Sequence, residues 1–172
     1  MSICRCSLPP DAFLQRYAGN DGYADCFRID VPENIGLGRY VEAFYTTWLF
    51  KAERAILSLA GHPSTDAEAA VAAQGDASRF AAWHVEARAD DQLLMCDVTG
   101  RTRSWFKVAP NKNGSTTLYF GSAVTAVKTG DVGRKSMGLA FQVMMPVHIL
   151  FSRGLLSATR RKIARSSQHV MA

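Results

Sequence analysis

Residues 82–124, AWHVEARADDQLLMCDVTGRTRSWFKVAPNKNGSTTLYFGSAV, decide the fold of this chain. Turn-forming residues at 89–91, 99–100 and 111–114 divide the stretch into four runs that are rich in Trp, Val, Thr, Phe and Tyr. Asp, Asn and Gly favour tight hairpin turns, and β-branched and aromatic side chains fit a pleated, half-buried surface. The stretch therefore predicts four antiparallel strands joined by short turns.

Alternation along these runs predicts which side chains face the core, because successive side chains of a strand point to opposite sides. One face receives Trp83, Val85 and Ala87, then Thr102, Ser104, Phe106 and Val108, and finally Leu118, Phe120, Ser122 and Val124. The opposite face of the third run carries Arg101, Arg103, Trp105 and Lys107 and is expected to meet solvent or a polar cavity. Gly121 predicts a bulge or a close approach of the backbone.

Three further elements precede these strands. Residues 23–31 alternate between apolar and polar side chains and end before a proline, which predicts another strand. From Tyr40 to Ala60 apolar residues repeat at i, i+3, i+4 and i+7, which predicts one amphipathic helix of about five turns. A shorter helix over 66–73 is expected to begin at a Ser64 or Thr65 cap.

Residues 137–165 predict a long C-terminal helix after a polar connection from Lys128 to Ser136. Pro146 predicts a kink or a broken start in this helix, because proline removes a helix hydrogen bond. After Asp131 the chain has seven basic residues and no acidic one. The positive charge therefore belongs to the C-terminal segment.

The composition describes a globular protein. The 172 residues are 48% hydrophobic and 20% charged, with a net charge of +5. This length suits one domain over residues 1–172, with an ordered core of about 7–165. No run reaches the roughly 18–20 apolar residues of a membrane span, and the N-terminus lacks the apolar core of a secretory signal. We therefore expect a cytoplasmic protein.

The four cysteines are Cys4, Cys6, Cys26 and Cys96. In a cytoplasmic chain they are expected to be reduced, and Cys26 and Cys96 fall in predicted strands, where a thiol packs as a small apolar group. Cys4 and Cys6 are spaced as two metal ligands could be, but no second Cys/His pair follows at zinc-ligand spacing. We expect no metal and no cofactor.

The predicted order resembles the helix-grip arrangement of the START and polyketide-cyclase-like proteins, in which a curved antiparallel sheet grips a C-terminal helix. The chain is similar to a bacterial family of unknown function of this type in residues 44–50, 97–105 and 118–124. The resemblance covers roughly residues 23–160. It implies an α+β fold with two helices inserted after the first strand and a cavity between sheet and helices. It implies no catalytic residue.

Aromatic side chains on the helix and the strands are candidates to line such a cavity, and they equally suit a filled core. The candidates are Tyr45, Trp48, Trp83, Trp105 and Phe120. Asp97, Arg101 and Arg103 flank one hairpin, and an arginine there suits a ligand carboxylate or phosphate, or a strand-end ion pair. His148 lies on an apolar stretch of the last helix and suits a general base or a structural residue.

These observations lead to an expected function and its alternatives. We expect a small apolar or amphipathic ligand to bind between sheet and helices. A protein–protein interaction module is one alternative, either as a homodimer or with another chain, using Met137, Met144 and Met145 as adaptable contacts. A cavity enzyme of the cyclase or isomerase type, using His148 or Asp97, is another. The absence of a basic stripe with interleaved aromatics argues against nucleic acid.

The cationic end of the last helix suits an anionic membrane surface, and it equally suits the negative pole of the helix dipole. Membrane insertion there would need Leu155, Leu156 and Ile163, which the core also needs. Burying a leucine contributes about 1.5–3 kcal/mol, against about 1 kcal/mol for a basic residue near an anionic surface. We therefore expect these side chains in the core and at most a weak, peripheral, salt-sensitive membrane contact.

Overall fold

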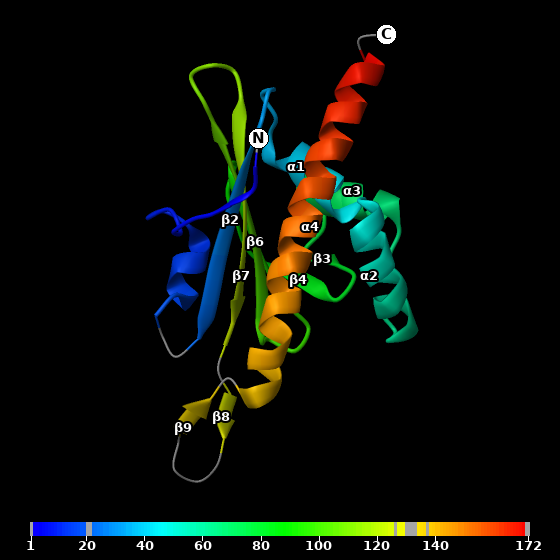
Figure 1. The fold of residues 1–172 in the computed structure, drawn as a ribbon. Coiled ribbons are helices and arrows are strands. Elements are labelled where there is room, and N and C mark those ends of the chain that lie inside the picture. Colours follow the sequence, from blue (N-terminus) through cyan, green and yellow to red (C-terminus); the bar gives the residue numbers. More distant parts are fainter. Residues whose placement is uncertain (1, 20–21, 126, 130–133, 137, 171–172) are drawn as a thin grey trace.

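The computed structural model describes residues 2–19, 22–125, 127–129, 134–136 and 138–170, and the side chains of 147–167 within the last segment (Figure 1). In this part of the chain, seven antiparallel strands form a curved open sheet, four α-helices accompany it, and the longest helix is C-terminal. The prediction of an α+β fold with a sheet that grips a C-terminal helix is confirmed.

The strands of the sheet lie in the order β1-β2-β7-β6-β5-β4-β3. Their bounds are β1 Cys4–Arg5, β2 Tyr23–Val31, β3 Arg79–Phe80, β4 Trp83–Arg88, β5 Gln92–Asp97, β6 Thr102–Pro110 and β7 Thr116–Val124. The predicted strand at 23–31 and the four strands of the 82–124 stretch are all present. Since β2 pairs with β7, the strand that precedes the helices lies beside the last strand of the sheet. The connection predicted between Lys128 and Ser136 contains a separate hairpin, β8 Val127–Thr129 with β9 Arg134–Ser136.

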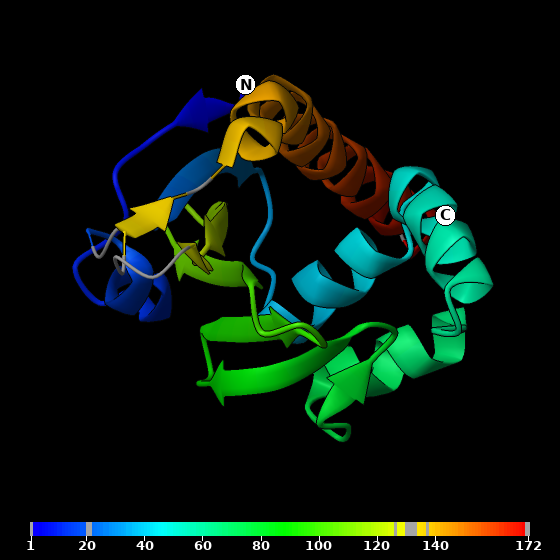
Figure 2. The ribbon, with the colours of Figure 1, turned by 90° about the horizontal axis from the view of Figure 1, so that it is seen from below.

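The helices are α1 Leu37–Tyr45, α2 Trp48–Leu59, α3 Asp66–Gln74 and α4 Gly138–Val170, and a 3-10 helix, η1, spans Phe13–Tyr17. Seen from below, α1, α2 and α4 lie on one side of the curved sheet and η1 on the opposite side (Figure 2). The helix α4 continues through position 146, so it does not begin at Pro146. Among the described residues, no helix combines the length and the apolar character that crossing a bilayer requires.

The single helix predicted over 40–60 is wrong, because the chain breaks it at Thr46 and Thr47. The Thr47 hydroxyl donates to the Phe44 carbonyl (2.9 Å) and accepts from the Phe50 amide (3.2 Å), so it caps α2. Threonine hydroxyls compete for backbone groups in this way and favour helix ends. Three helices, rather than two, therefore separate β2 from the following strands.

The side-chain alternation predicted for the strand at Trp83 holds as far as Val85 and fails at Ala87. The register of β4 against β5 shifts between Val85 and Ala87, which is a β-bulge. Ala87 therefore packs on the convex side of the sheet. Arg88 reaches the end of α3 instead, where its guanidinium donates to the carbonyls of Ala72 (3.2 Å) and Ala73 (2.6 Å).

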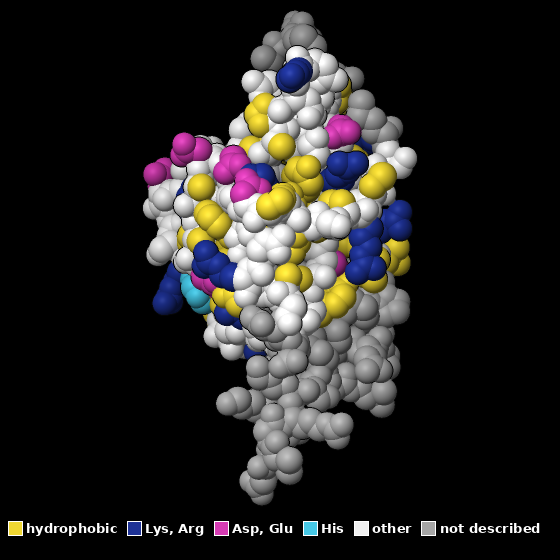
Figure 3. All heavy atoms as spheres, turned by 90° about the vertical axis from the view of Figure 1, so that its left-hand side faces the viewer, with side chains coloured by type: hydrophobic (Ala, Val, Ile, Leu, Met, Phe, Trp, Pro, Cys, Tyr) yellow, Lys and Arg dark blue, Asp and Glu magenta, His cyan; other side chains and the backbone are white. Residues whose placement is uncertain are grey.

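The convex face of the sheet is covered by the N-terminal segment, so the prediction that the face of Trp105 meets solvent or a polar cavity is wrong. Trp105 has no exposed surface and packs with Leu14 and Cys26. Its indole N–H donates to Gln92 Oε1 (3.0 Å), which also accepts from the Phe13 amide (3.0 Å). On the surface of this side of the molecule, acidic and basic side chains lie among scattered hydrophobic ones (Figure 3).

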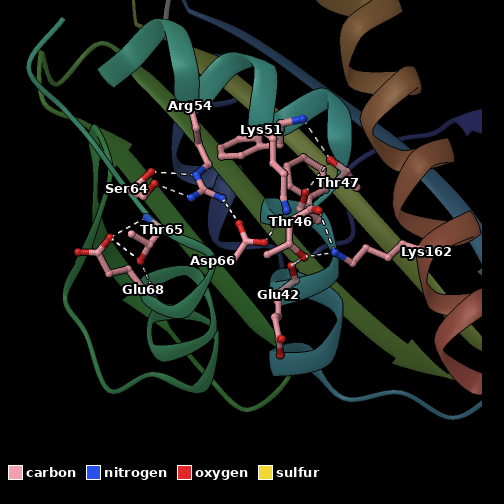
Figure 4. A network of polar contacts seen from close by, with 12 residues as sticks. Glu42, Thr46, Thr47, Lys51, Arg54, Ser64, Thr65, Asp66, Glu68 and Lys162 are labelled. Carbon is pink, nitrogen blue, oxygen red and sulfur yellow. Dashed lines mark hydrogen bonds and ion pairs between the residues drawn. The ribbon is translucent and has the colours of Figure 1, made fainter. Parts of the chain in front are cut away.

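A polar network joins the break between α1 and α2 to α3 and α4 (Figure 4). Arg54 of α2 is buried and donates to Ser64 Oγ (2.9 Å) and to Asp66 Oδ1 (2.7 Å), the first residue of α3. Lys162 of α4 donates to the carbonyl and hydroxyl oxygens of Thr46 (2.8 and 2.6 Å). Thr65 caps α3 in a reciprocal pair with Glu68, as one of the two predicted caps. These contacts hold α2 in one orientation.

The core predictions for α4 are confirmed. Leu155, Leu156 and Ile163 are buried, with 3%, 0% and 1% of their surface exposed. Of the three methionines proposed as contact residues, Met137 and the side chains of Met144 and Met145 lie outside the described residues. Cys26 and Cys96 are buried thiols, as predicted.

Gly121 is in regular register, without a bulge, and of the two alternatives predicted for it the close approach is present. A Cβ at this position would lie 2.8 Å from the Asp25 carbonyl oxygen and 2.8 Å from Leu14 Cδ2. We expect Gly121→Ala to lower the free energy of unfolding by about 1–3 kcal/mol, because the backbone cannot move aside cheaply. Urea denaturation checks this, with Gly36→Ala as the control, because a Cβ there meets no described atom within 4 Å. Equal losses in the two variants would contradict the expectation.

Candidate functional site

A cavity of about 120 Å³ lies between the concave face of the sheet and the helices α1, α2 and α4. Two groups of side chains line it. The helices contribute Phe44, Tyr45, Phe50, Glu53, His148, Phe151, Ser152 and Leu155, and the strands contribute Trp83, Thr102, Ser104, Phe106, Phe120 and Ser122. Half of these side chains are those of Phe, Tyr or Trp, and the others are four Ser or Thr hydroxyls, the titratable Glu53 and His148, and Leu155.

The floor of the cavity consists of two adjacent rows across the sheet. Strand register places Phe106 beside Phe120, and Ser104 beside Ser122 one step further along the same face. Asp25 of β2 extends the serine row, since it pairs with Ser122. The alternation of apolar and polar residues thus gives the cavity one aromatic and one polar part.

Three buried polar atoms on this cavity have no hydrogen-bond partner among the described residues: Tyr45 Oη, Trp83 Nε1 and His148 Nε2. They come from α1, β4 and α4. Tyr45 as a whole is only 2% exposed. Leaving a buried donor unsatisfied costs about 1–3 kcal/mol, so three such atoms around one cavity indicate a place for polar groups that a ligand or water brings.

Asp25 is the acidic group beneath His148. Its side chain has no exposed surface, and Oδ2 lies 3.5 Å from His148 Nε2. The carboxylate also accepts from the Tyr23 hydroxyl (2.9 Å) and from the Ser122 amide (3.0 Å). Burial, and then the charge of Asp25, raise the pKa of Tyr23 to about 12, so this hydroxyl keeps its proton and serves as a donor. These contacts hold the Asp25 carboxylate in place beside His148.

Glu53 of α2 is the second titratable group that lines the cavity. Burial raises its pKa to about 7, and the nearby His148 opposes part of this shift. A carboxyl group with such a pKa exchanges its proton close to neutral pH. Glu53 and His148 thus place two titratable side chains from two helices at one cavity.

Of the residues predicted to bind a ligand, the structure brings four together: Tyr45, Trp83, Phe120 and His148 all line the cavity. Trp48 is 70% exposed on the outer side of α2, because the break at Thr46–Thr47 changes the phase of the helix. The prediction for Trp105 is wrong for the reason given above, since it lies on the convex side of the sheet.

The hairpin residues predicted as polar anchors also lie outside the cavity. Asp97 Oδ1 accepts from the backbone amides of Arg101 (2.9 Å) and Thr102 (3.1 Å), so it shapes its own turn. Arg101 is exposed. Arg103 makes an ion pair with Glu86 at 3.2 Å, so it is paired as the alternative to ligand binding expected, although its partner lies on β4 and not in the same hairpin.

Glu53, Asp25 and the serine row were not predicted. Glu53 lies off the apolar stripe of a continuous helix, and it turns inward only because α2 restarts at Trp48. Asp25 was recognisable as an acidic residue within an apolar strand face, between Tyr23 and Phe27. Ser104 and Ser122 were assigned to the inner face, although not to a site.

No three His, Cys, Asp or Glu side chains of the described residues gather closely enough to hold a metal ion. Comparison of the chain with protein-family models, with curated proteins and with solved structures finds no match. The geometry of the cavity is therefore the basis for the functional argument.

The raised pKa of Glu53 makes stability depend on pH. The folded value of about 7 exceeds the ordinary value of 4.5, so stability falls as the pH rises between these two values. We expect Glu53→Gln, which stays neutral, to be more stable than the wild type at about pH 8, by up to about 3 kcal/mol. At about pH 4 the two should be alike, because both side chains are then uncharged.

Urea denaturation at the two pH values measures this difference. The matched control is Glu42→Gln, the same chemical change on α1 outside the lining of the cavity. A stability difference between Glu53→Gln and the wild type that is the same at both pH values would show that the pKa of Glu53 is not raised in the folded protein.

Proposed function

We propose that the protein binds a neutral, ring-sized molecule with oxygen acceptors in the cavity between sheet and helices. The observation that carries the proposal is the convergence of three buried polar atoms that make no hydrogen bond within the described part of the chain, on Tyr45, Trp83 and His148, around one aromatic cavity. The helix-grip resemblance of the sequence is consistent with this location, since a cavity between sheet and C-terminal helix is what it implies.

The volume limits the size of the ligand. An engineered protein cavity of about 150 Å³ holds benzene, whereas pockets for drug-sized ligands have about 300–1,000 Å³. The cavity in this protein, with its volume of about 120 Å³, can hold a single ring or a few ordered waters, and it is too small for a long acyl chain. The amphipathic ligand expected from the sequence is therefore narrowed to a small cyclic compound.

The polar groups limit the chemistry of the ligand. The indole N–H of Trp83 only donates, and the Tyr45 hydroxyl can donate, so the ligand offers acceptor oxygens to them. An anionic ligand would meet Glu53 and the buried Asp25, and like charges in a poorly solvated site disfavour binding. A phenol or a cyclic ketone fits both conditions.

We expect phenol and cyclohexanone to bind, as measured by chemical-shift perturbation of Trp83 and His148. Tyr45→Phe should weaken binding about two- to tenfold, because a net hydrogen bond is worth about 0.5–1.5 kcal/mol. The matched control is Tyr119→Phe on the convex face, which should leave binding unchanged. Ser104→Leu fills the cavity and should abolish binding. Equal affinity of the wild type and Ser104→Leu would refute the proposal.

A second candidate function, a cavity enzyme, is favoured by the pairing of Glu53 with His148. An enol–keto isomerisation needs one group that removes a proton from carbon and another that gives a proton to the carbonyl oxygen. The carboxylate of Glu53 suits the first role, and His148 in its protonated form, beside Asp25, suits the second. The step leaves Glu53 protonated and His148 neutral, and the reverse step returns both to their starting forms, so no further reactant is needed.

We expect the wild type to accelerate exchange of the α-protons of cyclohexanone for deuterium in heavy water, followed by NMR. Glu53→Gln should lower the rate to that of the buffer while the ketone still binds. Glu42→Gln is the control for the charge change. Binding without exchange in the wild type would leave the ligand-binding proposal standing and remove the enzymatic one.

A further inference from the structure

Of the seven large hydrophobic side chains that are exposed in the described part of the chain, five lie on the neighbouring helices α2 and α4. They are Trp48 (70%), Ile56 (69%), Leu59 (92%), Val147 (56%) and Leu150 (74%). We call these five residues, together with Arg161 and Arg165, the α2–α4 face. Isolated exposed apolar residues are ordinary, whereas a gathering of this kind marks a contact surface.

The apolar residues of α2 share one side of the helix. Positions 48, 52, 55, 56 and 59 repeat at three- and four-residue spacing, and all five are exposed. A helix that continued from α1 would have placed Trp48 and Ile56 on its buried stripe. The break at Thr46–Thr47, together with the contacts of Arg54 to Ser64 and Asp66, holds them outward instead (Figure 4).

One side of α4, which contacts α2, forms a second stripe that is exposed at Val147, Leu150, Arg161 and Arg165 and half-buried at Gly154 and Ser157. Positions 147, 150, 154, 157, 161 and 165 follow the same helical spacing. Gly154 faces α2, since a Cβ there would lie 3.1 Å from Leu49 Cδ2. The stripe is apolar at Val147 and Leu150 and cationic at Arg161 and Arg165.

The cationic part of the face surrounds a tryptophan. A surface hollow of about 570 Å³ is lined by Trp48, Arg161 and Arg165, with Lys162 and the two threonines of the helix break. Arg161 and Arg165 are exposed. Lys162 is held by Thr46, so its ammonium group stays at the hollow.

Acidic groups on these helices are turned inward or neutralised. Helix α4 contains no acidic residue. The one acidic residue of α2, Glu53, lines the interior cavity. Asp66, at the start of α3, is paired with Lys51 (2.5 Å) and Arg54 (2.7 Å). The opposite side of the molecule, by contrast, presents both signs of charge (Figure 3).

We propose that the α2–α4 face docks on the surface of an anionic lipid bilayer. Such a surface uses both parts of the face, because exposed leucine, isoleucine and valine enter the boundary of the acyl chains while arginines meet the phosphate groups. Tryptophan favours the region of the bilayer between the acyl chains and the phosphate groups, where its apolar ring is buried and its N–H finds a hydrogen-bond partner. The contact is peripheral, since it involves side chains on one side of two helices.

A second copy of the chain is the competing occupant, and it fits less well. A symmetric dimer places the same patch on both partners. Its apolar parts could meet, but the arginines of both copies would then gain no acidic partner, because α4 has none to offer. The charge of the face thus favours an anionic partner over a copy of itself.

Vesicle sedimentation tests the proposal with the full chain. We expect the wild type to sediment with phosphatidylcholine vesicles that contain about 30% phosphatidylserine, and at least about tenfold more weakly with pure phosphatidylcholine. Arg161→Gln with Arg165→Gln should weaken binding at least about tenfold. The charge-matched control is Arg5→Gln with Arg28→Gln, two exposed arginines on β1 and β2, which should bind as the wild type does.

A second pair of variants tests the apolar part of the face. Ile56→Ser with Leu59→Ser changes two exposed side chains, so circular dichroism should show an unchanged fold while vesicle binding falls about tenfold or more. About 1 M salt should weaken wild-type binding as well, because it shortens the screening length to about 3 Å. These variants leave the interior cavity intact, so the phenol-binding measurement separates this inference from the proposed function.

Two results would overturn the inference. One is a wild-type protein that does not sediment with anionic vesicles, or arginine and Ile56/Leu59 variants that bind the vesicles as strongly as the wild type. The other is a dimer in light scattering that Ile56→Ser with Leu59→Ser dissociates, without vesicle binding, which would assign the face to a second copy.

Discussion

The packing of Phe44 against the sheet is the contact on which the rest of the structure depends. Its ring lies 4.8 Å from the ring centres of both Phe106 and Phe120, and Tyr40, Tyr45 and Phe50 surround it at 5.8–6.4 Å. This cluster ties α1 to the two central strands of the sheet and is buried throughout. Aromatic pairs of this geometry add to the free energy of burial, so the cluster holds α1 and the start of α2 against the sheet.

The cavity exists because this aromatic cluster stops short of the polar row on the same sheet face. Beyond Phe106 and Phe120, the next inward positions are Ser104 and Ser122, whose side chains are too small to fill the space beneath α4. The space is closed by Glu53 and His148 from two helices. Titratable groups thus line a cavity that the chain could have filled with apolar side chains, and they retain buried polar atoms at a cost in stability.

The break between α1 and α2 serves both surfaces of α2. Because of the break, the inner side of α2 places Glu53 at the cavity. The outer side of α2 exposes Trp48, Ile56 and Leu59. Both results follow from one change of helix phase that Thr47 imposes by capping α2. A change at Thr47 would therefore act on the interior site and on the outer face together, whereas changes at Glu53 or Leu59 act on one of them.

The sequence by itself determined the strands, the long C-terminal helix that packs on them and, except beyond the bulge at Ala87, which side chains share a face, because these follow from local periodicity and turn chemistry. It also determined that Leu155, Leu156 and Ile163 are buried, since the same leucines could not serve both core and surface. Only the tertiary structure decided that Trp105 lies beneath the N-terminal segment, that α2 changes phase, and that Asp25, Glu53 and His148 meet. These three residues lie on β2, α2 and α4, far apart in the chain, and contacts of that kind depend on how whole elements pack, which no local pattern encodes.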